Sequence, residues 1–150
     1  MRAASLALKM FSTFLGLEIS VPSWTAGRLW LLRIGLYKLR RPKEIADDWI
    51  WTVDHTVQLG NVKCMVVLGI RRKHLPKGEL YLAHRDVEPI GLIPVEKSSG
   101  EIVFGQLEKN IEKTGIPRQI VSDHGTDIKC GVEMFCAKYD TVHTYDIKHK

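Results

Sequence analysis

Two aspartates lie within or just after short runs of apolar and β-branched residues. Asp54 interrupts the run Trp51-Thr-Val-Asp-His-Thr-Val57, and Asp123 follows Ile120-Val-Ser. An ionised carboxylate among apolar neighbours needs a partner, because removing its charge from water is costly. A divalent cation can compensate for that cost, and Mg²⁺ and Mn²⁺ prefer oxygen ligands. The residue types therefore predict a site for Mg²⁺ (or Mn²⁺) built from Asp54 and Asp123.

The chain after residue 46 has the pattern of an α/β domain with a mixed five-stranded sheet. Helices are expected from Ser98 or Ser99 to about Gly115 and from 126 to 139. Strands are expected at 49–57, 62–70, 86–95, 117–122 and 141–147. A meander of three strands followed by two right-handed crossovers gives the order 3-2-1-4-5. Strands 1 and 4 are then neighbours, so Asp54 and Asp123 can meet.

Pro89 and Pro94 lie in the third expected strand. Because proline has no amide hydrogen to donate to a sheet, they predict that this strand lies at an edge.

The first 46 residues are expected to form a small helical arm and a linker. A first helix ends near Gly16, and a second begins after Pro22 with Ser23 or Thr25 as its N-cap. Two helices with exposed arginines match a helix-turn-helix DNA reader, although an ordinary helical hairpin fits equally well. The predicted domains are therefore a DNA-binding arm and linker at 1–46 and a core at 47–150.

The positive charge belongs to this arm. Residues 1–46 hold eight Lys or Arg against two Asp or Glu, while the remainder holds fourteen against fifteen. A compact basic segment predicts a polyanionic partner, through phosphate attraction and counterion release, although simple solvation of the charges is an alternative. The side chains expected to contact DNA are Arg28, Arg33, Lys38, Arg40, Arg41 and Lys43.

Composition excludes several other classes. Hydrophobic residues make up 45% and charged residues 26% of 150 residues, which are globular values. The sequence contains no run of about 18 consecutive apolar residues, so it predicts no membrane-spanning helix. Three cysteines are typical of a reduced compartment, so a cytoplasmic location is expected. For His55 and His124, packing or hydrogen bonding is favoured over contact with phosphate or metal.

The two aspartate motifs carry a family resemblance. Trp51-Thr-Val-Asp54-His-Thr and Val121-Ser-Asp-His-Gly-Thr-Asp127 resemble the catalytic core of insertion-sequence transposases and retroviral-type integrases, with its ribonuclease H-like fold. Asp54 matches the first catalytic aspartate and Asp123 the second. The resemblance implies Mg²⁺-dependent phosphodiester cleavage and strand transfer in DNA transposition and integration. It also implies binding to element ends and target DNA, a homo-oligomer when full length, and a bacterial, nucleoid-associated location.

One departure from the family concerns its third carboxylate, a Glu on a helix after the fifth strand. Glu133 lies one element too early, and Asp140 and Asp146 flank or end the last expected strand. The expectation is therefore a truncated copy, inactive or impaired in strand transfer. The alternatives are a ribonuclease H-like nuclease that only hydrolyses, and a non-catalytic DNA-binding relic.

Overall fold

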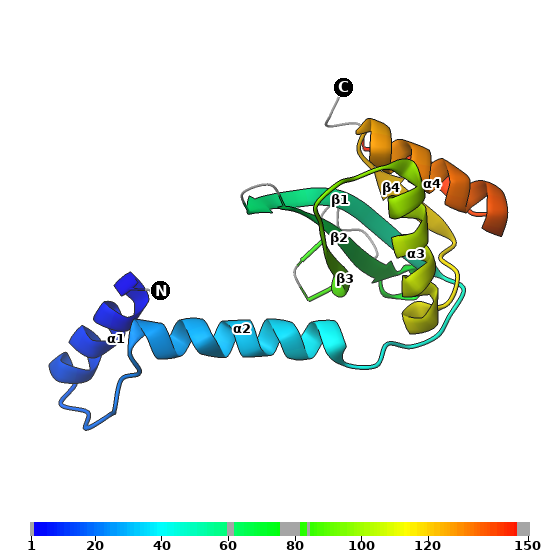
Figure 1. Ribbon diagram of the computed structural model, residues 1–150. Helices are drawn as coiled ribbons and strands as arrows, with labels where there is room; N and C mark the ends of the chain where they lie inside the picture. The colour runs from blue at the N-terminus through cyan, green and yellow to red at the C-terminus, as the bar shows by residue number, and fades with distance from the viewer. Residues whose placement is uncertain (1, 60–61, 76–81, 84, 147–150) are drawn as a thin grey trace. The chain divides into compact units, whose positions relative to one another are not determined.

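The computed structural model describes residues 2–59, 62–75, 82–83 and 85–146, which divide into two compact units between Arg40 and Arg41 (Figure 1). The division falls before the boundary at 46/47 predicted from the sequence.

The N-terminal unit consists of the helices α1 (Arg2–Phe14) and α2 (Trp24–Arg40). Gly16, with φ +64°, follows the end of α1 in the left-handed region that glycine tolerates. Ser23 caps α2, because its hydroxyl accepts the Ala26 amide hydrogen bond at 3.1 Å. Both end signals were predicted. Residues 15–23 join the helices, whereas a helix-turn-helix uses a turn of three to four residues. The DNA-binding role of this unit therefore stays a prediction.

In the part of the chain that the structure describes, no helix is both long enough and apolar enough to span a bilayer.

The second unit contains one five-stranded sheet in the order β3-β2-β1-β4-β5, which confirms the predicted topology. Strands β1, β2 and β3 are antiparallel, while β4 is parallel to β1 and β5 is parallel to β4. β3 lies at an edge, as its prolines predict. The strands are β1 (Trp49–Leu59), β2 (Val62–Arg71), β3 (Glu88–Val95), β4 (Gln119–Ser122) and β5 (Val142–Tyr145). The sequence Leu59-Gly60-Asn61 predicts a turn between the first two strands, and Gly60 and Asn61 lie outside the described residues.

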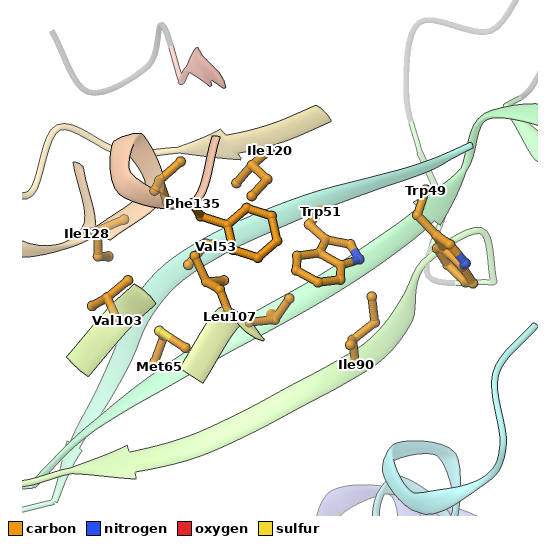
Figure 2. Close-up of a cluster of buried hydrophobic side chains, with 12 residues drawn as sticks. Trp49, Trp51, Val53, Met65, Ile90, Val103, Leu107, Ile120, Ile128 and Phe135 are labelled. Atoms are coloured by element: carbon orange, nitrogen blue, oxygen red, sulfur yellow. The ribbon is translucent and has the colours of Figure 1, made fainter. Parts of the chain in front are cut away.

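Two helices, α3 (Gly100–Thr114) and α4 (Thr126–Tyr139), make the crossovers and cover one face of the sheet (Figures 1 and 2). The core between these helices and the sheet is built from alternate residues of the strands and from one side of each helix. Trp51 is fully buried and lies 5.8 Å from Phe135, centroid to centroid. The core residues labelled in Figure 2 are Trp49, Trp51, Val53, Met65, Ile90, Val103, Leu107, Ile120, Ile128 and Phe135. Because side chains alternate along a strand, Thr52 and Asp54 belong to the opposite face.

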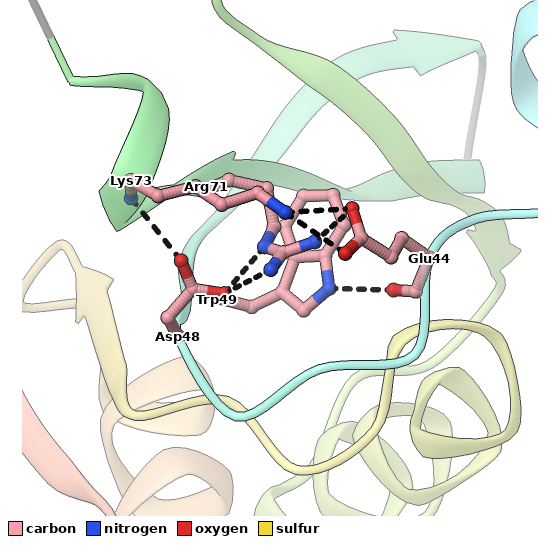
Figure 3. A network of polar contacts seen from close by, with 5 residues as sticks. All are labelled: Glu44, Asp48, Trp49, Arg71 and Lys73. Atoms are coloured by element: carbon pink, nitrogen blue, oxygen red, sulfur yellow. Dashed lines mark hydrogen bonds and ion pairs between the residues drawn. The ribbon is translucent and has the colours of Figure 1, made fainter.

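Residues 39–48 were predicted to be a linker, but from residue 41 onward they bind the core. The Ala46 amide donates to the Thr114 carbonyl at 2.8 Å. The guanidinium of Arg71, only 7% exposed, pairs with Glu44 and Asp48 and lies over the Trp49 ring (Figure 3). We call this group the Arg71 network. Sequence reasoning missed it because its partners are far apart along the chain.

Charge pairing in the Arg71 network lowers the pKa values of its two carboxyl groups, Glu44 and Asp48. Burial would raise the pKa of Asp48, but hydrogen bonds from Arg71 and the Lys73 amide outweigh it, so the pKa lies below its usual value. The Lys73 ammonium, followed by Arg71, lowers the pKa of Glu44.

Candidate metal and nucleic-acid site

The two predicted aspartates each follow the last residue pair of the ladder between β1 and β4. Thr52 pairs with Val121, and Val53 pairs with Ser122, in a parallel ladder. Asp54 and Asp123 are each the next residue along, which predicts that their backbones are neighbours where β4 ends. Neighbouring strands are about 4.8 Å apart, close enough for two carboxylates to share one cation.

The premise that Asp54 is buried among apolar neighbours is wrong, because Asp54 is exposed. The helices α3 and α4 cover the face that carries Trp51 and Val53, and Asp54 extends from the other face. An exposed carboxylate needs no compensating cation for its own stability. It is, however, accessible to a hydrated cation and to a phosphate group.

The Asp123 side chain is oriented by the turn that leads into α4. The Gly125 amide donates to Asp123 Oδ1 at 3.0 Å. This contact holds one carboxylate oxygen in a local turn, a common arrangement for aspartate.

We expect Gly125→Ala to weaken cation binding several-fold while lowering the free energy of unfolding by less than about 1 kcal/mol. Gly125 has an ordinary φ of −54°, so the backbone tolerates alanine. A Cβ there would lie 3.1 Å from Asp123 Oδ1 and would shift the carboxylate. Titration with Mn²⁺ and chemical denaturation separate the two effects. Unchanged Mn²⁺ affinity would show that the orientation of Asp123 does not matter.

A second cluster of polar side chains lies next to the aspartates, and we call it the His55 cluster (His55, Ser98 and Asp127). His55 Nδ1 is 3.5 Å from Asp127 Oδ2, and His55 Nε2 is 3.4 Å from Ser98 Oγ. Burial would raise the pKa of Asp127, but hydrogen bonds from Ser98 and from backbone amides, with the His55 charge, hold it below its usual value. The sequence motif includes Asp127, but nothing in it indicates a contact with Ser98.

Two further histidines, His124 and His143, have ring or hydrogen-bond contacts. His124 stacks on Tyr145 with the ring centroids 4.5 Å apart. His143 Nε2 is 2.9 Å from the buried Ser122 hydroxyl, and burial lowers the pKa of His143. These contacts are consistent with the packing roles favoured for His55 and His124.

Of the three acids considered as a third ligand, Asp146 alone follows a residue paired with Ser122, as Asp54 does. Glu133 accepts a hydrogen bond from the Tyr145 hydroxyl at 3.0 Å, and Asp140 ends α4 with φ 51°. The Asp146 amide donates to the Ser122 carbonyl at 2.9 Å. Among the described residues, no group of three His, Cys, Asp or Glu side chains is placed to hold a metal ion.

The basic residues predicted to contact DNA fall in both units. Four of them occupy exposed positions of α2: Arg28, Arg33, Lys38 and Arg40. Arg41 and Lys43 belong to the core unit instead, where both pair with Glu88. The Lys43 side chain is only 3% exposed, so in this conformation it is poorly placed to contact a phosphate.

Comparison with solved structures finds likenesses to integrases. One is a chain of the simian T-cell lymphotropic virus intasome in complex with PP2A regulatory subunit B56 gamma. It has 15% identity and a TM-score of 0.46, over 71% of this chain and 34% of that chain. Another is the HTLV-2 integrase catalytic core domain in complex with magnesium. Its dimeric form has 16% identity and a TM-score of 0.44, over 71% of this chain and 66% of that chain. Its trimeric form has 17% identity and a TM-score of 0.45, over 69% and 63%.

The chain thus spans about a third of the intasome chain and just under two thirds of the integrase core domains. These likenesses concern the arrangement of the chain, and no activity follows from them. Comparisons of the sequence with protein-family models and with curated proteins find no match.

Proposed function

We propose that the second unit is the catalytic-core part of a transposase-like or integrase-like protein that acts on DNA. In this proposal Asp54 and Asp123 hold Mg²⁺ or Mn²⁺. The observation that supports it is the parallel register of β1 and β4, in which Asp54 and Asp123 each follow a residue of the last pair, Val53 and Ser122.

The donor set fits such an ion. Mg²⁺ is usually bound by one or two carboxylates, with water and substrate phosphates as its remaining ligands. Asp54 is exposed and Asp123 is half-buried, so both can reach a cation that is also in contact with a phosphate. When bound, the ion would stabilise the negative charge that develops as a phosphodiester is displaced.

The chain's own residues would orient the two carboxylates and bind the phosphate backbone. The Gly125 amide holds one oxygen of Asp123, which restricts how that side chain turns. The basic residues of α2 would contribute phosphate contacts that depend on salt. We expect no strand transfer by the isolated chain, because among the described residues no three carboxylates are grouped to hold a metal ion, where the resemblance calls for three.

The test is binding of a fluorescent DNA duplex with and without Mn²⁺, for the wild type, Asp54→Asn and Asp123→Asn. We expect Mn²⁺ to tighten DNA binding by the wild type about tenfold, since the ion joins the aspartates to a phosphate. The DNA affinity of both variants should not change when Mn²⁺ is added. Asp47→Asn, which removes an exposed charge before β1, is the matched control and should retain the effect. An Mn²⁺ effect that persists in both variants would refute the proposal.

Cleavage and joining of plasmid DNA in the same mixtures separate the alternatives. Metal-dependent nicking that Asp54→Asn abolishes would indicate a nuclease. Binding without nicking, insensitive to Mn²⁺, would indicate a DNA-binding relic. Joining of DNA strands by the purified chain would contradict the expected impairment. A shallow dependence of binding on salt would contradict DNA as the partner.

A further inference from the structure

The His55 cluster joins three elements immediately beside the aspartate pair. His55 follows Asp54 on β1, Asp127 is in the first turn of α4, and Ser98 precedes the N-cap of α3. The His55 side chain is 13% exposed and the Asp127 side chain 25% exposed. Both ring nitrogens of His55 face a polar partner, at 3.5 Å and 3.4 Å.

Strand alternation relates this cluster to Asp54. Val53 is buried under the helices, and His55, two residues further along β1, extends toward the same side and reaches α4. Asp54 lies between them and extends from the opposite face. Holding the His55 side chain against α4 therefore also fixes the backbone that directs Asp54.

The same cluster is tied to Asp123. A Cβ placed on Gly125 would lie 3.1 Å from Asp123 Oδ1 and 3.5 Å from Asp127 Oδ1, so both carboxylates border this turn. Asp127 also lies in the first turn of a helix, where a negative charge is favourable. Asp127 therefore contacts β1 through His55, and it borders the turn that follows Asp123.

Two roles are open to a carboxylate so placed: a third ligand of the cation, or a group that positions the ligands. The first role is disfavoured, because among the described residues no three acidic, histidine or cysteine side chains are grouped to hold a metal. In addition, Asp127 already contacts His55 and Ser98.

We propose that Asp127, with Ser98, is a positioning residue that holds His55 and thereby keeps Asp54 aligned with Asp123. The consequence for cation affinity rests on the proposed function, whereas the alignment itself does not. Groups that orient metal ligands in this way typically alter metal affinity by about 10–100-fold when they are removed.

The experiment compares Asp127→Ala, the near-isosteric Asp127→Asn and a matched control, Glu101→Ala. Glu101 is likewise an acid in the first turn of a helix that hydrogen-bonds a serine, but on α3. Hydrogen exchange is measured in the metal-free protein, and Mn²⁺ affinity is measured with a DNA duplex present.

With Asp127→Ala we expect the Asp54 and His55 amides to exchange at least about tenfold faster and Mn²⁺ affinity to fall about tenfold. Asp127→Asn should retain most of the wild-type protection from exchange and most of the Mn²⁺ affinity, because its amide oxygen can still accept a hydrogen bond from His55. Glu101→Ala should change neither.

Three results would decide against the proposal or separate it from the proposed function. Exchange at Asp54 and His55 equal to that in Glu101→Ala would overturn it, and so would acceleration spread evenly over the second unit, which indicates general destabilisation. If the wild type bound no Mn²⁺ while exchange changed as expected, the proposed function would fail and the positioning role would stand.

Discussion

Gly131→Ala is expected to lower the free energy of unfolding by about 2 kcal/mol. Gly131 lies on α4 where it crosses α3, and an added Cβ would lie 2.5 Å from Val103 Cβ and 2.7 Å from the Gly100 carbonyl oxygen. Neither neighbour can move alone, since one is a β-branched side chain and the other is backbone. The two helices would have to separate, and this would loosen the core that supports β1 and β4.

Gly105→Ala is the matched control, because Gly105 is on α3 and has no atom within 4 Å of the added Cβ. Alanine there should raise stability by about 0.5–1 kcal/mol through its helix propensity. Denaturant unfolding of both variants measures the contrast. Equal changes in the two variants would show that α3 and α4 do not pack as closely as described.

Arg71→Met is expected to cost about 2 kcal/mol of unfolding free energy at neutral pH. The buried guanidinium neutralises Glu44 and Asp48 and covers the Trp49 ring (Figure 3). Methionine fills similar space but leaves both carboxylates without that partner. We place the cost below the range for fully buried pairs because the Glu44 side chain is 57% exposed. Arg72→Met, at the neighbouring exposed position, should have little effect and serves as the control.

The stability difference between wild type and Arg71→Met should shrink in acid. In the folded wild type the pKa values of Glu44 and Asp48 lie below their usual values. Their contribution is therefore complete above the unfolded-state pKa and is lost as the pH falls through the folded-state pKa. Unfolding curves measured from pH 7 to pH 3 test this window, and a difference that stays constant across it would contradict the assigned pairing.

Local patterns predicted most of the fold. The bounds of α4 agree with the prediction at 126 and 139, and the strand order follows from alternating strands and helices under the right-handed crossover rule. The order of the strands along the chain predicts the order in the sheet, because the crossover rule determines which strand lies beside each new one. The prediction that Asp54 meets Asp123 rests on the same reasoning.

The errors arose where distant residues decide the outcome. Residues 41–48 have the composition of a linker, yet Arg71, Glu88 and Thr114 hold them to the core. The apolar run around Asp54 suggested burial on both faces, whereas in the second unit the helices cover only one. The His55 cluster combines single residues from three elements, and neither periodicity nor motif spacing indicates such a contact.

The most direct test of the paired aspartates is a double-mutant cycle on Mn²⁺ affinity, with DNA present. We expect Asp54→Asn and Asp123→Asn each to weaken binding at least about tenfold, and the double variant to lose little more than either one, because both residues hold the same ion. Losses that add independently, or a wild type that binds no Mn²⁺, would contradict a shared cation at the junction of β1 and β4.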